Sequence, residues 1–146
     1  MKKKILVIHG PNLNLLGVRE PHLYGRSSLP KINGELKKLG KTFKVAVECV
    51  QSNSESKLID KIQAARSKVD GLIINPGGFS HTSVAIRDAL AALEIPKIEV
   101  HLTNPQAREE FRRQMITAGA VDGVISGFGA HSYMLALQAL FTLIRP

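Results

Sequence analysis

Five short apolar runs, each followed by a segment with helical periodicity, constrain the fold of this chain more than any other feature of its sequence. The runs predict strands at Ile5–Ile8, Phe43–Val50, Leu72–Asn75, Lys97–His101 and Gly123–Ser126. The segments after them predict helices at Leu29–Leu39, Ser54–Lys68, Thr82–Leu93, Pro105–Ala118 and His131–Leu143. Strands separated by helices pair in parallel, because each helix carries the chain back to the edge where the previous strand began.

The predicted strands are almost continuously apolar, as expected when helices cover both faces of a sheet. We therefore expect an α/β fold, a three-layer sandwich with a five-stranded parallel sheet and helices on both faces. The strand order 2-1-3-4-5 of flavodoxin-like proteins is the first choice. With 146 residues and a composition that is 44% hydrophobic, the chain is expected to form a single domain spanning residues 1–146.

The formal net charge of +8 at pH 7 admits a nucleic acid, a membrane surface or a small anion as a partner. The lysines are scattered with few aromatic residues between them, which favours a small anionic ligand. We expect no membrane partner and no functional nucleic-acid partner, only weak, salt-dependent binding at most. The first ten residues do not have the pattern of a secretion signal, so we expect a cytoplasmic protein in which Cys49 is only a small buried side chain.

The connection between the first strand and the first helix, HGPNLNLLGVREPHLYGRSS, is about twenty residues long. Such connections usually have about two to six residues, and longer ones are commonly functional lids. In an open parallel sheet the ligand crevice lies beyond the carboxyl ends of the strands, beside strands 1 and 3. The long connection and the segment NPGGFSH, which follows the third strand, both emerge there. The sequence therefore predicts a crevice covered by a lid.

Four polar side chains lie at or just beyond the ends of strands 1, 3 and 4 and are expected in this crevice: Asn12, Asn75, His81 and His101. Glu99 is two residues from His101 on the same predicted strand, so both side chains point to one face of the sheet. A carboxylate beside an imidazole fixes its tautomer and favours its protonated form. The pair is therefore a candidate for chemistry, and a purely structural Glu–His pair would have the same spacing.

The helix expected at 105–118 contains Arg108 and Arg112, which are four residues apart and would share one helical face. They begin one turn inside the helix N-terminus, where backbone N–H groups already favour an anion. This arrangement predicts a clamp for a carboxylate or a polyol. The alternative is an ordinary solvated face on which Glu109 and Glu110 balance the arginines.

The predicted lid carries Arg19 and Tyr24 in the segment GVREPHLYG. A phenol with arginines nearby has its ionised form favoured, which makes Tyr24 a candidate base. The alternative is that Tyr24 is a packing residue or an anchor of the loop.

Several familiar sites are missing from the sequence. It has no H-E-x-x-H motif, no paired C-x-x-C motif and no close cluster of His and Asp, so no metal is expected. It has no P-loop and no G-x-S-x-G elbow, and GFGAHS matches the dinucleotide fingerprint at two glycines only. A receiver domain of the same fold would need acidic residues where the chain has His9 and Asn75. A flavin phosphate would need a hydroxyl-rich loop where the chain has PNLNLLG.

Three segments, HGPNLNLLGVREPHLYG, NPGGFSHTSVAIRDAL and IEVHLTNPQAREEFR, together resemble the type II 3-dehydroquinate dehydratases. The resemblance runs from Ile5 to the final helix. It implies a flavodoxin-like subunit in a homo-oligomer, a dodecamer built from trimers, without a cofactor. It also implies the anti elimination of water from 3-dehydroquinate to 3-dehydroshikimate through an enolate, in the shikimate pathway of aromatic amino acid biosynthesis.

The same resemblance implies roles for the candidate catalytic residues. Tyr24 corresponds to the catalytic base, and Arg19 corresponds to its activating partner in the lid. His101 corresponds to the acid that protonates the leaving hydroxyl, and Glu99 corresponds to the residue that orients it. Asn12 corresponds to the group that stabilises the enolate-like intermediate through a water.

The resemblance further implies these substrate ligands: Asn75, His81, Arg112, the backbone N–H groups of Leu102 and Thr103, and Asp88 from a neighbouring subunit. Arg108 corresponds to a residue that supports the lid and the base. The chain departs from the commonest family pattern at positions that bear on oligomer contacts and on the loop after His101: Ser54, Ser56, Pro105, Gln106 and His131. The alternative function is a non-enzymatic flavodoxin-like domain that binds a small anion or a nucleotide, and turnover of dehydroquinate separates the two.

Overall fold

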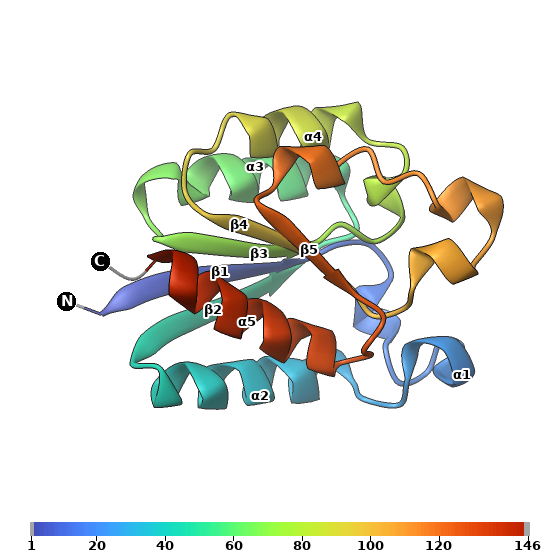
Figure 1. Ribbon diagram of the computed structural model, residues 1–146, viewed down its shortest axis with the longest axis horizontal. Coiled ribbons are helices and arrows are strands. Elements are labelled where there is room, and N and C mark those ends of the chain that lie inside the picture. The colour runs from blue at the N-terminus through green and yellow to red at the C-terminus, as the bar shows by residue number, and fades with distance from the viewer. Residues whose placement is uncertain (1, 145–146) are drawn as a thin grey trace.

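A five-stranded parallel sheet is the middle layer of the computed structural model, which describes residues 2–144 (Figure 1). Its strands are β1 (Lys3–His9), β2 (Val45–Gln51), β3 (Gly71–Asn75), β4 (Lys97–His101) and β5 (Gly123–Ser126). They pair in the order β2-β1-β3-β4-β5, which confirms the predicted topology. The carboxyl ends of β1, β3 and β4 therefore meet at one edge of the sheet.

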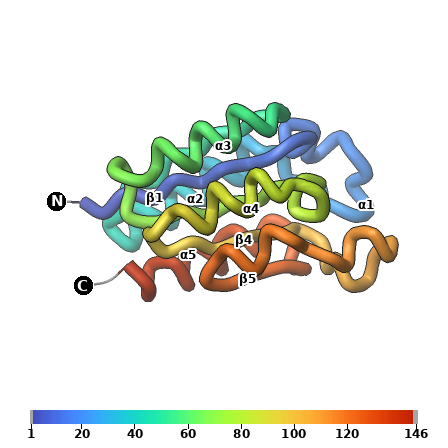
Figure 2. Tube along the Cα trace, turned by 90° about the horizontal axis from the view of Figure 1, so that it is seen from above, coloured from blue at the N-terminus to red at the C-terminus, as the bar shows by residue number. Residues whose placement is uncertain are grey.

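Helices cover both faces of the sheet (Figures 1 and 2). One face carries α2 (Leu29–Thr42) and α5 (His131–Ile144), and the other carries α3 (Glu55–Ala64) and α4 (Val84–Ala91). A short helix, α1 (Pro21–Tyr24), lies within the long connection after β1. None of the helices within residues 2–144 is long and apolar enough to cross a membrane.

Alternating strand residues divide the apolar core into two layers. From β1, Ile5 and Val7 pack with α2 and α5, whereas Leu6 and Ile8 pack with α3 and α4. Cys49 of β2 is only half-buried, at the margin of the first layer. Its partial burial still raises the pKa of the thiol to about 11, so the side chain is a neutral thiol at pH 7.

Side-chain caps explain where two predicted helices begin. The Ser54 hydroxyl accepts a hydrogen bond from the backbone N–H of Lys57 (3.4 Å), so α3 starts directly after Ser54. The Ser83 hydroxyl accepts from the backbone N–H of Ile86 (2.9 Å), and α4 therefore begins at Val84, two residues later than predicted. His131 is the exposed first residue of α5.

The helix predicted at 105–118 is wrong. This segment forms short 3₁₀ helices at Pro105–Ala107 and Glu110–Arg112, and a third follows at Ala118–Ala120. Its backbone bonds to other parts of the chain instead: the Gln114 carbonyl accepts from His81, the Ile116 carbonyl accepts from Arg87, and the Ile116 N–H donates to the Ser80 carbonyl. These bonds replace the regular ladder that an α-helix requires. Arg108 and Arg112 therefore do not share a helical face.

His9, the last residue of β1, is fully buried between Tyr133 of α5 and Asn33 of α2. Its Nε2 lies 2.7 Å from Asn33 Oδ1, which can only accept, so Nε2 carries the proton. Its Nδ1 lies 2.8 Å from the Tyr133 hydroxyl and accepts from it. Burial lowers the pKa of His9 to about 4, although the bond to Asn33 opposes the shift, so the ring is neutral at pH 7.

We predict that acid destabilises the fold through His9. In the unfolded chain the pKa of His9 returns to 6.5, so the unfolded state binds a proton that the folded state excludes until the pH approaches about 4. The contribution to the free energy of unfolding is fully present above pH 6.5 and falls by about 3 kcal/mol as the pH drops to about 4. Urea unfolding at pH 7 and at pH 4 measures this loss. His9→Gln, which does not titrate, should lose less stability, and an equal loss in both proteins would contradict the prediction.

Candidate active site

A cavity of about 140 Å³ lies at the carboxyl ends of β1, β3 and β4, between the long connection after β1 and the segment after β4. Most of the predicted functional residues line it: Asn12, Arg19, Tyr24, Asn75, His81, His101, Leu102, Thr103, Arg108 and Arg112. Two predicted residues do not line it. Glu99 is fully buried and bonded to His101, and Asp88 is exposed on α4.

Beside the cavity, the backbone after β1 and the backbone after β3 lie so close together that only glycine fits between them. The Gly10 N–H donates to the Asn75 carbonyl (2.8 Å), and a Cβ on Gly10 would lie 2.5 Å from the Pro76 carbonyl oxygen. Gly77 has a φ of 60°, in the left-handed region that favours glycine. Its N–H donates to Asn75 Oδ1 (3.0 Å). β3 therefore ends at Asn75, because this amide closes the turn that brings the following loop over the cavity.

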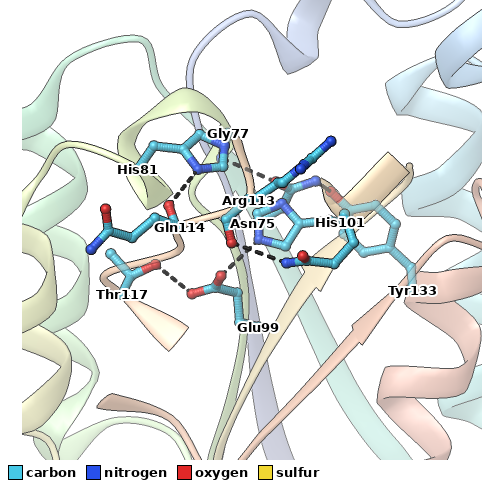
Figure 3. Close-up of polar contacts among 10 residues, drawn as sticks. Asn75, Gly77, His81, Glu99, His101, Arg113, Gln114, Thr117 and Tyr133 are labelled. Atoms are coloured by element: carbon cyan, nitrogen blue, oxygen red, sulfur yellow. Dashed lines mark hydrogen bonds and ion pairs between the residues drawn. The ribbon is translucent and has the colours of Figure 1, made fainter. Parts of the chain in front are cut away.

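Tyr133 fixes the orientation of the Asn75 amide from the core side (Figure 3). Asn75 Nδ2 donates to the Tyr133 hydroxyl (3.1 Å), and that hydroxyl gives its own proton to His9. Burial raises the pKa of Tyr133 above its ordinary value, so the hydroxyl stays neutral. Because Asn75 Oδ1 already accepts a hydrogen bond from the Gly77 N–H, the second N–H of Asn75 is the group available to a ligand.

His101 is held by the carboxylate of Glu99, as Figure 3 shows. The Nε2 atom of His101 lies 2.7 Å from Glu99 Oε2, which confirms that both side chains point to one face of β4. Glu99 Oε1 accepts a second bond from the Thr117 hydroxyl (2.6 Å). Because Nε2 donates to Glu99, Nδ1 is the nitrogen of His101 that remains for a ligand.

His81 forms the neighbouring wall of the cavity. Its Nδ1 lies 2.9 Å from the backbone carbonyl of Gln114, which can only accept, so Nδ1 carries a proton. Nε2 is then the nitrogen available to a ligand. The rings of His81 and His101 are 6.5 Å apart between centroids, so one ligand can contact both.

Tyr24 lies between two guanidinium groups. The Cζ atom of Arg19 is 4.7 Å from the ring centroid, and that of Arg108 is 5.1 Å away. Arg19 comes from the same lid segment as Tyr24, whereas Arg108 comes from the segment after β4. The Tyr24 side chain is buried, with 9% of the residue exposed. This placement joins the lid to the opposite wall of the cavity.

Glu109 contacts both arginines of the segment after β4. Its Oε1 lies 3.2 Å from Arg112 Nε and 3.5 Å from Arg108 Nε. A hydrogen bond from its own backbone N–H, with a smaller effect of the two arginines, lowers the pKa of Glu109. Glu109 therefore balances the arginines as the alternative interpretation expected, but both arginines still line the cavity.

Three residues of the site region escaped prediction: Gln114, Thr117 and Tyr133. Each bonds to a partner far away in the sequence, with separations of 33 residues to His81, 18 to Glu99 and 58 to Asn75. For Tyr133 a signal existed, because a tyrosine in an apolar helix usually needs a partner for its hydroxyl. Among residues 2–144 there is no group of three or more His, Cys, Asp or Glu side chains that could hold a metal ion.

Comparison with known proteins gives a consistent result. Residues 3–141 match the family described as Dehydroquinase class II. A protein of Acaryochloris marina named 3-dehydroquinate dehydratase is 55% identical over 139 residues, covering 95% of this chain and 93% of the relative. A protein of Aspergillus clavatus named catabolic 3-dehydroquinase is 50% identical over 138 residues, covering 94% and 92%.

Solved structures agree with these relatives. The crystal structure of a type II dehydroquinase from Butyrivibrio crossotus is similar with a TM-score of 0.93 and 46% sequence identity, covering 95% of this chain and 97% of that one. A type II dehydroquinase from Propionibacterium acnes gives a TM-score of 0.94 at 42% identity, covering 97% and 98%. The fold, the sequence and the cavity residues thus lead to one conclusion: the chain belongs to the class II dehydroquinase family.

Proposed function

We propose that this chain is a 3-dehydroquinate dehydratase, a hydro-lyase that converts 3-dehydroquinate to 3-dehydroshikimate in the shikimate pathway. One observation carries the proposal: a single cavity is lined by a phenol between two guanidinium groups and by an imidazole bonded to a buried carboxylate. The phenol suits the removal of a proton, and the imidazole suits the delivery of one. These are the two proton transfers that the elimination of water requires.

Tyr24 is the proposed base. A proton on the carbon next to a ketone can be removed when the oxyanion that forms is stabilised. We propose that the guanidinium groups of Arg19 and Arg108, which lie beside the Tyr24 ring, assist it in this role. Asn12, on the cavity wall, is proposed to stabilise the enolate oxygen through an ordered water.

His101 is the proposed acid. Its Nε2 donates to Glu99, so the proton given to the departing hydroxyl has to come from Nδ1, and the ring that acts as the acid carries a proton on both nitrogens. In the anti elimination, Tyr24 takes a proton from the carbon, the enolate collapses, and the hydroxyl leaves as water with the proton from His101.

The remaining cavity residues are proposed to bind the substrate. The backbone N–H groups of Leu102 and Thr103, directly after β4, suit the substrate carboxylate. Asn75, His81 and Arg112 suit its hydroxyl groups, because they offer two donors and one acceptor on neighbouring walls.

We also propose that the chain works as a cytoplasmic homo-oligomer, a dodecamer built from trimers. Asp88 supports this assembly, because it is exposed on α4 and does not line the cavity of its own chain. In the trimer it would reach the substrate of a neighbouring subunit. Light scattering of the purified protein measures the assembly.

The first test is turnover. Purified protein mixed with 3-dehydroquinate should produce the absorbance of the conjugated enone of 3-dehydroshikimate. Absence of any product would favour the non-enzymatic alternative, a domain that binds a small anion or a nucleotide.

We predict that Tyr24→Phe reduces turnover by orders of magnitude, because it keeps the ring between the arginines but removes the oxygen that takes the proton. Substrate binding and the free energy of unfolding should change little. Steady-state kinetics and substrate titration of the variant measure both. Near-normal turnover in Tyr24→Phe, together with an inactive His101→Ala, would mean that another group, such as His81, is the base.

We predict that borohydride added with substrate leaves activity intact, because no imine with a lysine forms. Within the described chain, no lysine lines the cavity. Lys97 of β4 lies at the opposite end of the strand from His101, and its Nζ donates to the carbonyls of Leu93 and Ile95. Chelators should also have no effect. Mass spectrometry of the treated protein provides the check, and a lysine carrying reduced substrate would refute the proposed route.

A further inference from the structure

The carboxylate of Glu99 has no exposed surface, and its two oxygens bond to two different donors. Oε2 lies 2.7 Å from His101 Nε2, and Oε1 lies 2.6 Å from the Thr117 hydroxyl. A buried carboxylate is costly unless hydrogen bonds satisfy it. Removing the Thr117 hydroxyl would leave Oε1 without its donor.

Thr117 is itself fully buried and does not line the cavity, so it can act on a substrate only through Glu99 and His101. Its backbone position is fixed independently of its hydroxyl. The backbone N–H groups of Ile116 and Thr117 lie 2.8 and 3.4 Å from the Ser80 carbonyl, and Arg87 donates to the Ile116 carbonyl. The hydroxyl is therefore held at Glu99 by the backbone around it.

The segment 114–117 also orients the second imidazole of the cavity. The Gln114 carbonyl accepts from His81 Nδ1 at 2.9 Å, three residues before Thr117 (Figure 3). One short segment thus fixes His81 directly and His101 through Glu99. This use of the segment is incompatible with the helix that its sequence suggests.

We propose that Thr117 is a positioning residue for the acid. Its hydroxyl holds Oε1 of Glu99, so that Oε2 stays directed at His101 Nε2 and Nδ1 stays directed to the substrate. Without this bond the carboxylate can turn about its own axis, and neither the tautomer nor the angle of the ring is fixed. The inference rests on the proposed function, in which His101 delivers the proton.

The experiment compares two substitutions at one position. Thr117→Val keeps the shape and removes the hydroxyl, whereas Thr117→Ser keeps the hydroxyl. We expect Thr117→Val to lower kcat by about 10- to 100-fold with little change in KM, and Thr117→Ser to restore most of kcat. Thr117→Ala serves as a second variant without the hydroxyl if valine prevents folding.

Ser80→Ala is the matched control. Ser80 is fully buried beside the same segment, but its hydroxyl has no partner among the described residues. Its loss should leave kcat unchanged. The inference is overturned if Thr117→Val keeps normal kcat, if Thr117→Ser is as impaired as Thr117→Val, or if only KM changes.

NMR of protein labelled with nitrogen-15 histidine separates this inference from the proposed function. In the native protein the Nε2 proton of His101 should give a low-field signal from its bond to Glu99. The signal should persist in Thr117→Ser and shift or broaden in Thr117→Val. If the native protein does not convert 3-dehydroquinate, the proposed function fails, but this readout still decides whether Thr117 positions His101. An unchanged signal in Thr117→Val would overturn the inference.

Discussion

The parallel pairing of β1, β3 and β4 is the constraint on which the rest of the structure depends. Three strands that run in one direction leave their carboxyl ends at one edge, and each connection there must turn away within a few residues. The chain solves this with close backbone contacts at Gly10 and Gly77, which leave no space for ordinary side chains. The polar residues that end the strands are thereby brought to a single cavity.

A second constraint is the burial of polar groups. The side chains at this edge are polar, but they start from strand residues that lie in the apolar core. The structure meets it with two buried hydrogen-bond chains, one on each side of the sheet. The first runs from Asn75 through Tyr133 and His9 to Asn33, and the second runs from Thr117 through Glu99 to His101. Each bond in these chains joins a donor to an acceptor, which offsets the cost of burying the polar groups.

Local periodicity predicted the strands, and with them the four polar residues at the strand ends, Asn12, Asn75, His81 and His101. Leu102 and Thr103 were expected only from the resemblance to a known family. Glu99 and His101 are the best example, since a spacing of two residues determines a shared face in any strand. The helix predicted at 105–118 was wrong because a helical pattern is a local property of the sequence. In the structure the Gln114 and Ile116 carbonyls accept hydrogen bonds from side chains that are distant in the sequence. Thr117 could not be predicted for the same reason, since nothing near it in the sequence indicates a bond to Glu99.

Tyr24 is flanked by one arginine that belongs to its own segment and by another that belongs to the opposite wall. Any outward movement of the lid would carry Arg19 along with the ring but would leave Arg108 behind. The Tyr24 ring would then keep one guanidinium neighbour and lose the other. The two guanidinium groups therefore flank Tyr24 together only while the lid lies against the segment after β4.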